Sequence, residues 1–156
     1  MTVLITNEQE TIPVSIEFIE KQADQILADL DSSDKELSIL VVDDARIRQL
    51  NQQYRDKDSA TDVLSFPQFD EEEEPGVSSH LLGDVVLSIE TAKLQAKEHD
   101  LSLEEELILL LTHGILHLLG YDHERSTSEA RAMQKKSRIL FANLYPGSTP
   151  SDTCDY

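Results

Sequence analysis

Residues 102–120 read SLEEELILLLTHGILHLLG. Ser102, followed three residues later by Glu105, forms a capping box, the pattern that begins a helix. The positions from 107 to 119 are almost all apolar, and Gly120 is the residue type favoured where a helix ends in a left-handed turn. A helix with so little polar surface has to be surrounded by other elements. We therefore expect this helix at the centre of the fold.

The spacing of apolar residues predicts the elements around this helix. We expect strands at Val3–Thr6, Leu37–Asp43, Thr61–Phe66 and Gly83–Glu90, and further helices from Ser15, from Asp44, over Thr91–His99 and from Ser126. Asp44 is expected to cap a helix that carries Ile47, Leu50 and Tyr54 on one face. The sequence thus predicts an α+β fold, in which a small mixed β-sheet of about four strands packs with about five helices. We expect one domain over residues 1–145 and a flexible tail over 146–156.

The charge of the chain is strongly negative. Its 156 residues include 13 Lys and Arg against 31 Asp and Glu, a net charge of −18. The content of Leu, Ile, Val and Phe stays above the ~20% needed for a folded core. The charge excludes a uniformly basic coat for nucleic acid and argues against binding to an anionic membrane. Most of the cations, however, fall within residues 46–58 and 124–138, so we expect a cationic cleft on an acidic body.

The N-terminal segment lacks the basic and apolar regions of a signal peptide. The longest apolar run, Leu107–Leu111, is far shorter than the ~20 residues that span a bilayer. We expect a soluble cytoplasmic protein with no membrane partner.

Three histidines near the end of the central helix predict a metal site. His113 and His117 are four residues apart, so their rings lie on one helix face at the separation that suits Zn²⁺. Gly120 allows a sharp turn that brings His123 back as a third ligand. Three neutral imidazoles leave a fourth position for water and lower its pKa towards ~7. Alternatively, the histidines are buried and bonded to the backbone, but one shared cation gives all three a partner at once.

We therefore predict one Zn²⁺ per chain, with Ni²⁺, Co²⁺ and Fe²⁺ as alternatives. The spacing of the three histidines is that of metzincin proteases. In those enzymes, however, a glutamate that acts as the general base follows the first histidine, and here that position is Gly114. A metallopeptidase is therefore an alternative function rather than the leading one.

Three segments give the chain a resemblance to a known family. They are LNQQYRDKDSATDVLSFP at residues 50–67, LGDVVLS at 82–88 and HGILHLLGYDH at 113–123. In order and spacing they resemble the bacterial YbeY-type family of zinc-dependent endoribonucleases, also described as rRNA maturation factors. Ala60 departs from the pattern, because the family usually has proline there, but the change affects only a loop.

The resemblance implies a single-strand-preferring endoribonuclease that acts in small-subunit rRNA maturation and ribosome quality control. Its expected partners are single-stranded RNA, rRNA, and the small ribosomal subunit with its associated proteins. The implied zinc ligands are His113, His117 and His123, and the implied catalytic residues are His113 and Arg55. A guanidinium can grip a phosphate with two hydrogen bonds and stabilise the charge that develops on its oxygens.

Other polar residues are given smaller roles. Lys57 either assists phosphate binding or is an exposed loop residue. Asp62 and Asp84 are expected to stabilise turns or, alternatively, to orient a zinc-bound histidine, and Asp122 has the same two interpretations. His99 is expected on the surface. A third candidate function is a non-catalytic, zinc-stabilised module that associates with the ribosome, although structural zinc sites usually have four protein ligands, with Cys prominent.

Overall fold

The computed structural model describes residues 3–68, 81–121 and 126–150. Within these residues the chain has the predicted α+β fold, a four-stranded sheet with five helices. In chain order the elements are β1 (Val3–Asn7), α1 (Ile16–Asp29), β2 (Glu36–Val42), α2 (Asp44–Arg55), β3 (Val63–Pro67), β4 (Leu81–Ser88), α3 (Ile89–Glu98), α4 (Leu103–Leu118) and α5 (Thr127–Leu144).

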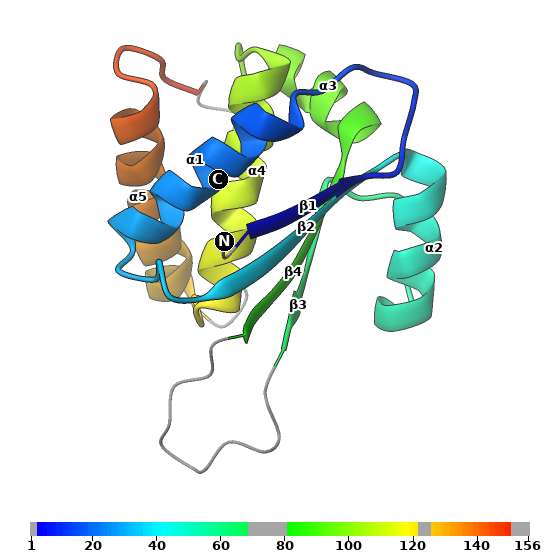
Figure 1. Ribbon diagram of the computed structural model, residues 1–156, viewed down its shortest axis with the longest axis horizontal. Coiled ribbons are helices and arrows are strands. Elements are labelled where there is room, and N and C mark those ends of the chain that lie inside the picture. The colour runs from blue at the N-terminus through cyan, green and yellow to red at the C-terminus, as the bar shows by residue number, and fades with distance from the viewer. Residues whose placement is uncertain (1–2, 69–80, 122–125, 151–156) are drawn as a thin grey trace.

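The sheet is mixed, with the strand order β1-β2-β4-β3. β1, β2 and β4 are parallel, whereas β3 runs antiparallel to β4 and forms one edge. Figure 1 shows α1, α4 and α5 on one side of the sheet and α2 on the other. The side chains of β3 alternate between these two sides, so this edge strand contributes to both.

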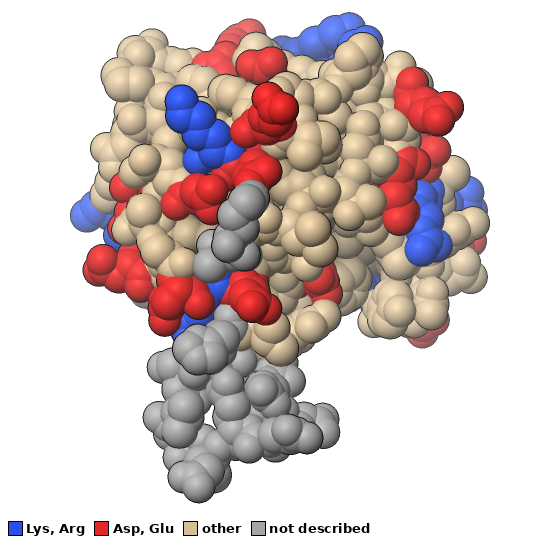
Figure 2. Space-filling view, in the orientation of Figure 1, with Lys and Arg blue, Asp and Glu red and all other residues tan. Residues whose placement is uncertain are grey.

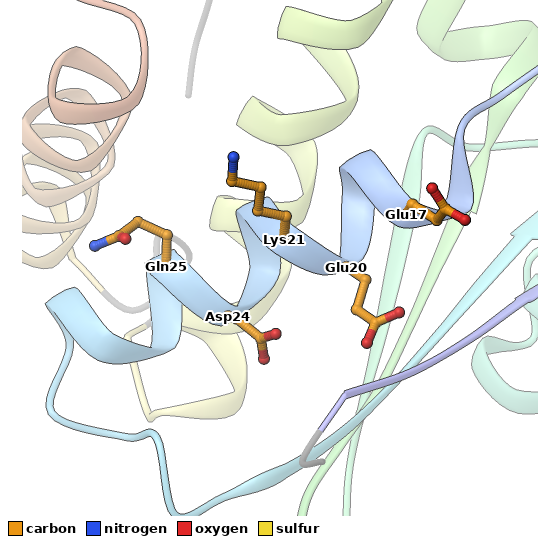
Figure 3. A pocket seen from close by; sticks show the side chains of 5 residues that line it. All are labelled: Glu17, Glu20, Lys21, Asp24 and Gln25. Carbon is orange, nitrogen blue, oxygen red and sulfur yellow. The ribbon is translucent and has the colours of Figure 1, made fainter.

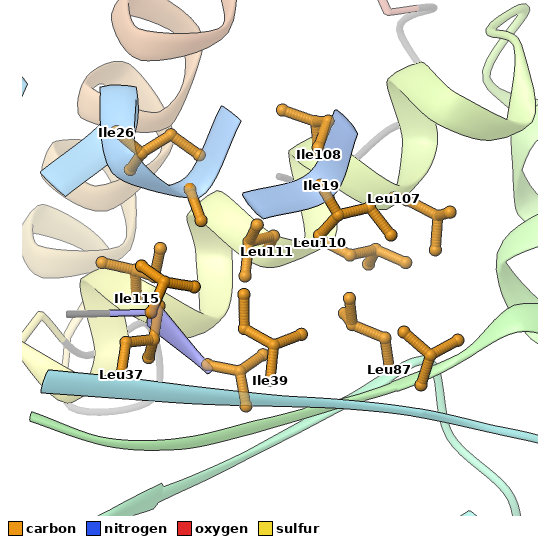
Figure 4. Close-up of a cluster of buried hydrophobic side chains, with 14 of the residues drawn as sticks. Ile19, Ile26, Leu37, Ile39, Leu87, Leu107, Ile108, Leu110, Leu111 and Ile115 are labelled. Atoms are coloured by element: carbon orange, nitrogen blue, oxygen red, sulfur yellow. The ribbon is translucent and has the colours of Figure 1, made fainter. Parts of the chain in front are cut away.

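The helix predicted at the centre is α4, and it begins with the predicted capping box. The backbone N–H of Glu105 donates to Ser102 Oγ at 3.1 Å, and Ser102 N–H donates to Glu105 Oε1 at 3.0 Å. Every residue from Glu106 to Leu116 is buried. The largest apolar cluster joins α4 to α1 and to the sheet side chains Ile39 and Leu87 (Figure 4). This packing fixes the position of α4 against the sheet.

Among the described residues, α2 is the helix that covers the opposite face of the sheet. Ile47 and Leu50 of this helix pack against Val42, Leu64 and Val86. Cover by one helix of 12 residues leaves part of that face open.

The structure corrects the residue that was predicted to cap α2. The N-cap is Asp43, whose carboxylate accepts from Arg46 N–H at 2.8 Å. Asp44 instead accepts from the hydroxyls of Ser88 and Thr91, both at 2.5 Å. Tyr54 lines the same hollow as Leu50, as expected for residues on one helix face, but it is 61% exposed, because it lies at the end of α2, beyond the cluster that buries Leu50.

His99 is buried rather than exposed as predicted. It follows the end of α3, and its ring Nδ1 lies 2.8 Å from Oε2 and 3.0 Å from Oε1 of Glu106. Both side chains are shielded from solvent, at 7% and 0% exposure. The pair therefore links α3 to the central helix inside the core.

None of the helices within the described residues is long and apolar enough to cross a membrane. The division between a domain at 1–145 and a tail at 146–156 stays a prediction. Ser148, beyond that boundary, donates a hydrogen bond to the side chain of Glu105, and residues 151–156 lie outside the described ranges.

Candidate functional site

A cavity of about 530 Å³ lies between the end of α2, β3 and the C-terminal half of α4. The polar side chains around it come from segments far apart in the sequence. They are Asn51, Arg55, Lys57, Ser59, Thr61, Asp62, Ser65, His113 and His117. The fold thus brings two of the predicted zinc ligands and the predicted catalytic arginine to one hollow.

His113 and His117 lie on consecutive turns of α4 and face the same cavity, as their spacing predicts. Their ring centres are 4.8 Å apart, and the ring planes meet at 81°. His113 is 9% exposed, and His117 is partly exposed. His123 and Asp122 lie outside the described residues. Two imidazoles that adjoin at the wall of an open cavity are suited to share one cation.

Gly114 brings the central helix against the sheet. A Cβ atom at this position would lie 2.9 Å from Cγ1 of Val85 and 3.2 Å from Oγ of Ser65. The Ser65 hydroxyl also donates to the Gly114 carbonyl at 3.2 Å. The position where a metzincin carries its glutamate therefore faces the packed sheet, with no room for a longer side chain unless the neighbours move.

Arg55 is the last residue of α2, and the edge strand holds its side chain. Its Nη2 donates to the backbone oxygen of Ser65 at 2.8 Å, and its guanidinium carbon lies 5.8 Å from the centre of the Phe66 ring. The helix ends because Asp56 adopts a left-handed conformation with φ of +57°. Arg55 also lines the cavity, and a guanidinium has further N–H groups that can donate to an anion.

The loop that follows α2 is folded back onto the helix. Lys57 N–H donates to the Asn51 carbonyl at 3.2 Å, and the Asn51 amide donates to the Ser59 carbonyl at 2.9 Å. Asn51 is buried at 4% exposure. These bonds hold the backbone around Lys57, which lines the same cavity as Arg55.

The two aspartates with alternative roles are separated by the sheet. Asp62 lines the cavity, and its Oδ1 accepts from Val63 N–H at 2.7 Å and from the Thr61 hydroxyl at 3.2 Å, which is the predicted turn role. Asp84 faces the α2 side and accepts from the Gln68 amide at 2.6 Å. Asp84 is therefore not among the described residues that line the cavity.

Ser65 is a site residue that the sequence interpretation did not include. Its backbone oxygen holds Arg55, and its hydroxyl holds the helix turn between the two histidines. It is buried at 8% exposure. In the sequence, Ser65 stands out as a polar residue in the middle of an apolar strand. Its position in the strand directs its side chain toward the central helix.

The cationic cleft predicted from the clustered charges is only partly present. Arg55 and Lys57 line the cavity, but Arg48 of the same window forms an exposed ion pair with Asp58, with Nε to Oδ1 at 2.7 Å. The cations of the second window that the structure describes lie on α5 and are not among the described lining residues. These cations of α5 therefore act on the electrostatic potential of the cavity from a distance, without lining it.

Another face of the molecule is acidic. Figure 2 shows Asp and Glu side chains gathered over the side that α1 covers. A shallow hollow of about 510 Å³ there is lined by Glu17, Glu20, Lys21, Asp24 and Gln25 (Figure 3). Three carboxylates beside one ammonium repel a polyanion, so this hollow is unsuited to nucleic acid, unlike the cavity that holds Arg55 and Lys57.

The chain was compared with known proteins. Residues 4–145 match the family model described as Endoribonuclease YbeY. Among curated relatives, an Endoribonuclease YbeY of Syntrophotalea carbinolica is 48% identical and one of Persephonella marina is 44% identical. The alignments cover 90% of this chain and 93% of the first relative, and 91% of this chain and 92% of the second.

A solved structure has a similar fold. The solution structure of a protein from Thermotoga maritima superposes with a TM-score of 0.64 at 26% identity, covering 92% of this chain and 89% of that one. Together with the family match over residues 4–145, these similarities show that the chain belongs to the Endoribonuclease YbeY family.

Proposed function

We propose that this chain is a zinc-dependent endoribonuclease that prefers single-stranded RNA and acts in small-subunit rRNA maturation and ribosome quality control. The observation that carries the proposal is that His113, His117 and Arg55 line one cavity. The family and the names of the relatives support the ribonuclease class. Cytoplasmic location and partnership with the small ribosomal subunit are parts of the same proposal.

The donor set fits zinc. Imidazole nitrogens are ligands that Zn²⁺ favours, and two rings 4.8 Å apart on one wall can converge on one ion. The described residues contain no complete group of three donors, and the proposed third ligand, His123, follows Gly120 by three residues outside them. When bound, zinc supplies a Lewis acid for a phosphate oxygen and lowers the pKa of coordinated water.

Arg55 would bind the phosphodiester and stabilise its developing charge. The guanidinium is anchored to Ser65 through one nitrogen, so it is oriented before substrate binds and pays little reorganisation cost in the transition state. Lys57, which lines the same cavity, adds a second positive charge. Asp62 is the one carboxylate among the described lining residues. With Oδ1 held by the backbone of Val63, Asp62 would accept the nucleophile's proton on Oδ2.

The nucleophile is either water or the RNA 2′-hydroxyl. The two routes leave different ends, because attack by the 2′-hydroxyl gives a 2′,3′-cyclic phosphate and attack by water gives a terminal phosphate monoester. Analysis of the product ends by mass spectrometry distinguishes them.

The alternative functions have weaker support. A metallopeptidase needs a general base beside the first histidine, and Gly114 packs there against Val85 and Ser65. A non-catalytic zinc module would not require an anchored arginine at the rim of an open cavity.

One experiment tests the ribonuclease against both alternatives. The purified chain is incubated with single-stranded RNA, duplex RNA and a peptide library, before and after treatment with a chelator, and the variants His113→Ala and Arg55→Ala are run beside it. Arg46→Ala is the matched control, because Arg46 is an exposed cation of α2 that does not line the cavity. We expect cleavage of single-stranded RNA by the wild type and by Arg46→Ala only. RNA cleavage that survives both His113→Ala and chelation would refute the proposal.

A further inference from the structure

A second hollow lies on the other face of the sheet, where α2 leaves the strands uncovered. It has a volume of about 410 Å³ and is lined by residues from all four strands and from α2, among them Leu4, Leu40, Tyr54, Phe66, Gln68 and Asp84. Leu4 is 67% exposed and Tyr54 61% exposed. We call this hollow the sheet groove.

The sheet groove adjoins the candidate active site across a single strand. Ser65 and Pro67 of β3 line the active-site cavity, while Phe66 between them lines the groove. The Phe66 ring centre lies 5.3 Å from that of Tyr54 in an edge-on arrangement and 5.8 Å from the guanidinium carbon of Arg55. One ring thus contacts both the proposed phosphate-binding residue and an exposed aromatic side chain.

We infer that Tyr54 and Phe66 form a stacking platform for one unpaired nucleobase, next to the phosphate that Arg55 binds. This inference rests on the proposed function. Exposed aromatic rings stack bases of any sequence, and the cations that bind the backbone lie beside them in single-strand binding sites. Here Arg55 occupies that place, because it lines the cavity and its guanidinium lies against Phe66 of the groove, and Lys57 lines the same cavity.

The chemistry of the groove favours a nucleobase over an apolar protein segment. Its floor is apolar, with Leu40 and Val86, but its rim carries the hydrogen-bonded pair of Gln68 and Asp84. A base has an apolar face that matches the floor of the groove and polar edges that match its rim. The base is also joined to a phosphate, which matches the adjoining cations. In a duplex both faces of the base are already stacked, so this platform would also account for a preference for single strands.

The first test is stopped-flow fluorescence with single-stranded RNA that carries 2-aminopurine at successive positions, which resolves binding before cleavage. We expect quenching at one position next to the cleaved bond. Tyr54→Ala should abolish that quenching and raise KM about tenfold with a smaller change in kcat, whereas Tyr54→Phe, which keeps the ring, should restore both. Leu94→Ala is the control, because Leu94 is an equally exposed apolar residue on α3. Equal KM and equal quenching in the wild type and Tyr54→Ala would overturn the inference.

The second test pairs the protein variant with the substrate. Removing the base at the quenched position should raise KM for the wild type and leave Tyr54→Ala unaffected, because the two changes remove the same contact. Additive effects would overturn the platform. If Tyr54→Ala changes the sedimentation coefficient of the chain instead of KM, the groove joins two copies and the inference is wrong. If the wild type cleaves no RNA, the proposed function itself is refuted. If the wild type cleaves RNA but Tyr54→Ala cleaves it equally well, the stacking platform alone is refuted.

Discussion

Nη2 of Arg55 lies 2.8 Å from the backbone oxygen of Ser65, to which it donates a hydrogen bond. β3 is the edge strand of the sheet that the described residues form, so an arginine can reach a carbonyl on its outer side. The hydroxyl of the same serine donates to Gly114, between the two histidines. Ser65 therefore connects the phosphate-binding side of the site to the metal-binding side.

This geometry predicts that Arg55 cannot be replaced by lysine. Lysine keeps the charge but lacks the planar fork that can hold Ser65 and a phosphate at once. We expect kcat for single-stranded RNA to fall about 10² to 10³-fold in Arg55→Ala and by at least tenfold in Arg55→Lys. Arg55 is exposed, so the melting temperature should change little. Full activity in Arg55→Lys would show that charge alone is needed.

The packing at Gly114 predicts a loss of stability on enlargement. Alanine gains helix propensity at this position, but its Cβ would lie 2.9 Å from Val85 Cγ1, an overpacking that costs about 1–3 kcal/mol. We expect Gly114→Ala to lower the free energy of unfolding in urea by about 1–2 kcal/mol. In a Val85→Ala background, where room exists, the same change should cost less. An equal cost in both backgrounds would contradict the contact.

Local signals in the sequence predicted the caps of α4 and α5, although α2 is capped by Asp43 rather than by Asp44. The capping box at Ser102 is confirmed, and the predicted N-cap Ser126 accepts from Glu129 N–H at 3.1 Å. These features depend on residues within one turn of each other. The spacing of His113 and His117 is local in the same sense, so the sequence could place both rings on one wall of the cavity.

Relationships between distant elements were not predictable in this way. Helical spacing put Tyr54 on the same face as Leu50, but whether that face is covered depends on where the sheet ends beneath α2. The partner of His99 lies on another helix, after a turn in which Asp100 has a φ of +57°. The contact of Arg55 with Ser65 depends on the strand order, which places β3 at the edge.

Metal binding should stabilise the chain. If zinc binds only the folded state, a concentration 100-fold above its Kd adds about 2.7 kcal/mol, which for a chain of this length raises the melting temperature by roughly 5–10 °C. We expect this rise when Zn²⁺ is added to chelator-treated wild type, and none in His117→Ala. Mg²⁺, which prefers oxygen ligands, serves as the control ion. An equal rise in His117→Ala would place the ion elsewhere.

The buried pair of His99 and Glu106 predicts a pH-dependent contribution to stability. Burial raises the pKa of the Glu106 carboxyl above its ordinary value of 4.5, and the hydrogen bond from His99 opposes the rise. The folded chain therefore holds this proton to a higher pH than the unfolded chain does. The stabilising contribution is complete below about 4.5 and is lost as the pH rises through the raised pKa of the folded state.

Glu106→Gln isolates this contribution, because glutamine does not titrate. We expect the free energy of unfolding of the wild type, relative to Glu106→Gln, to decrease as the pH is raised from 4 upwards. Urea unfolding at a series of pH values measures the difference, and it cancels the titration of groups that do not interact with Glu106. Glu104→Gln, an exposed carboxylate on the same helix, should show no such decrease. A difference that grows with pH would mean that the His99 hydrogen bond outweighs the cost of burying the charge.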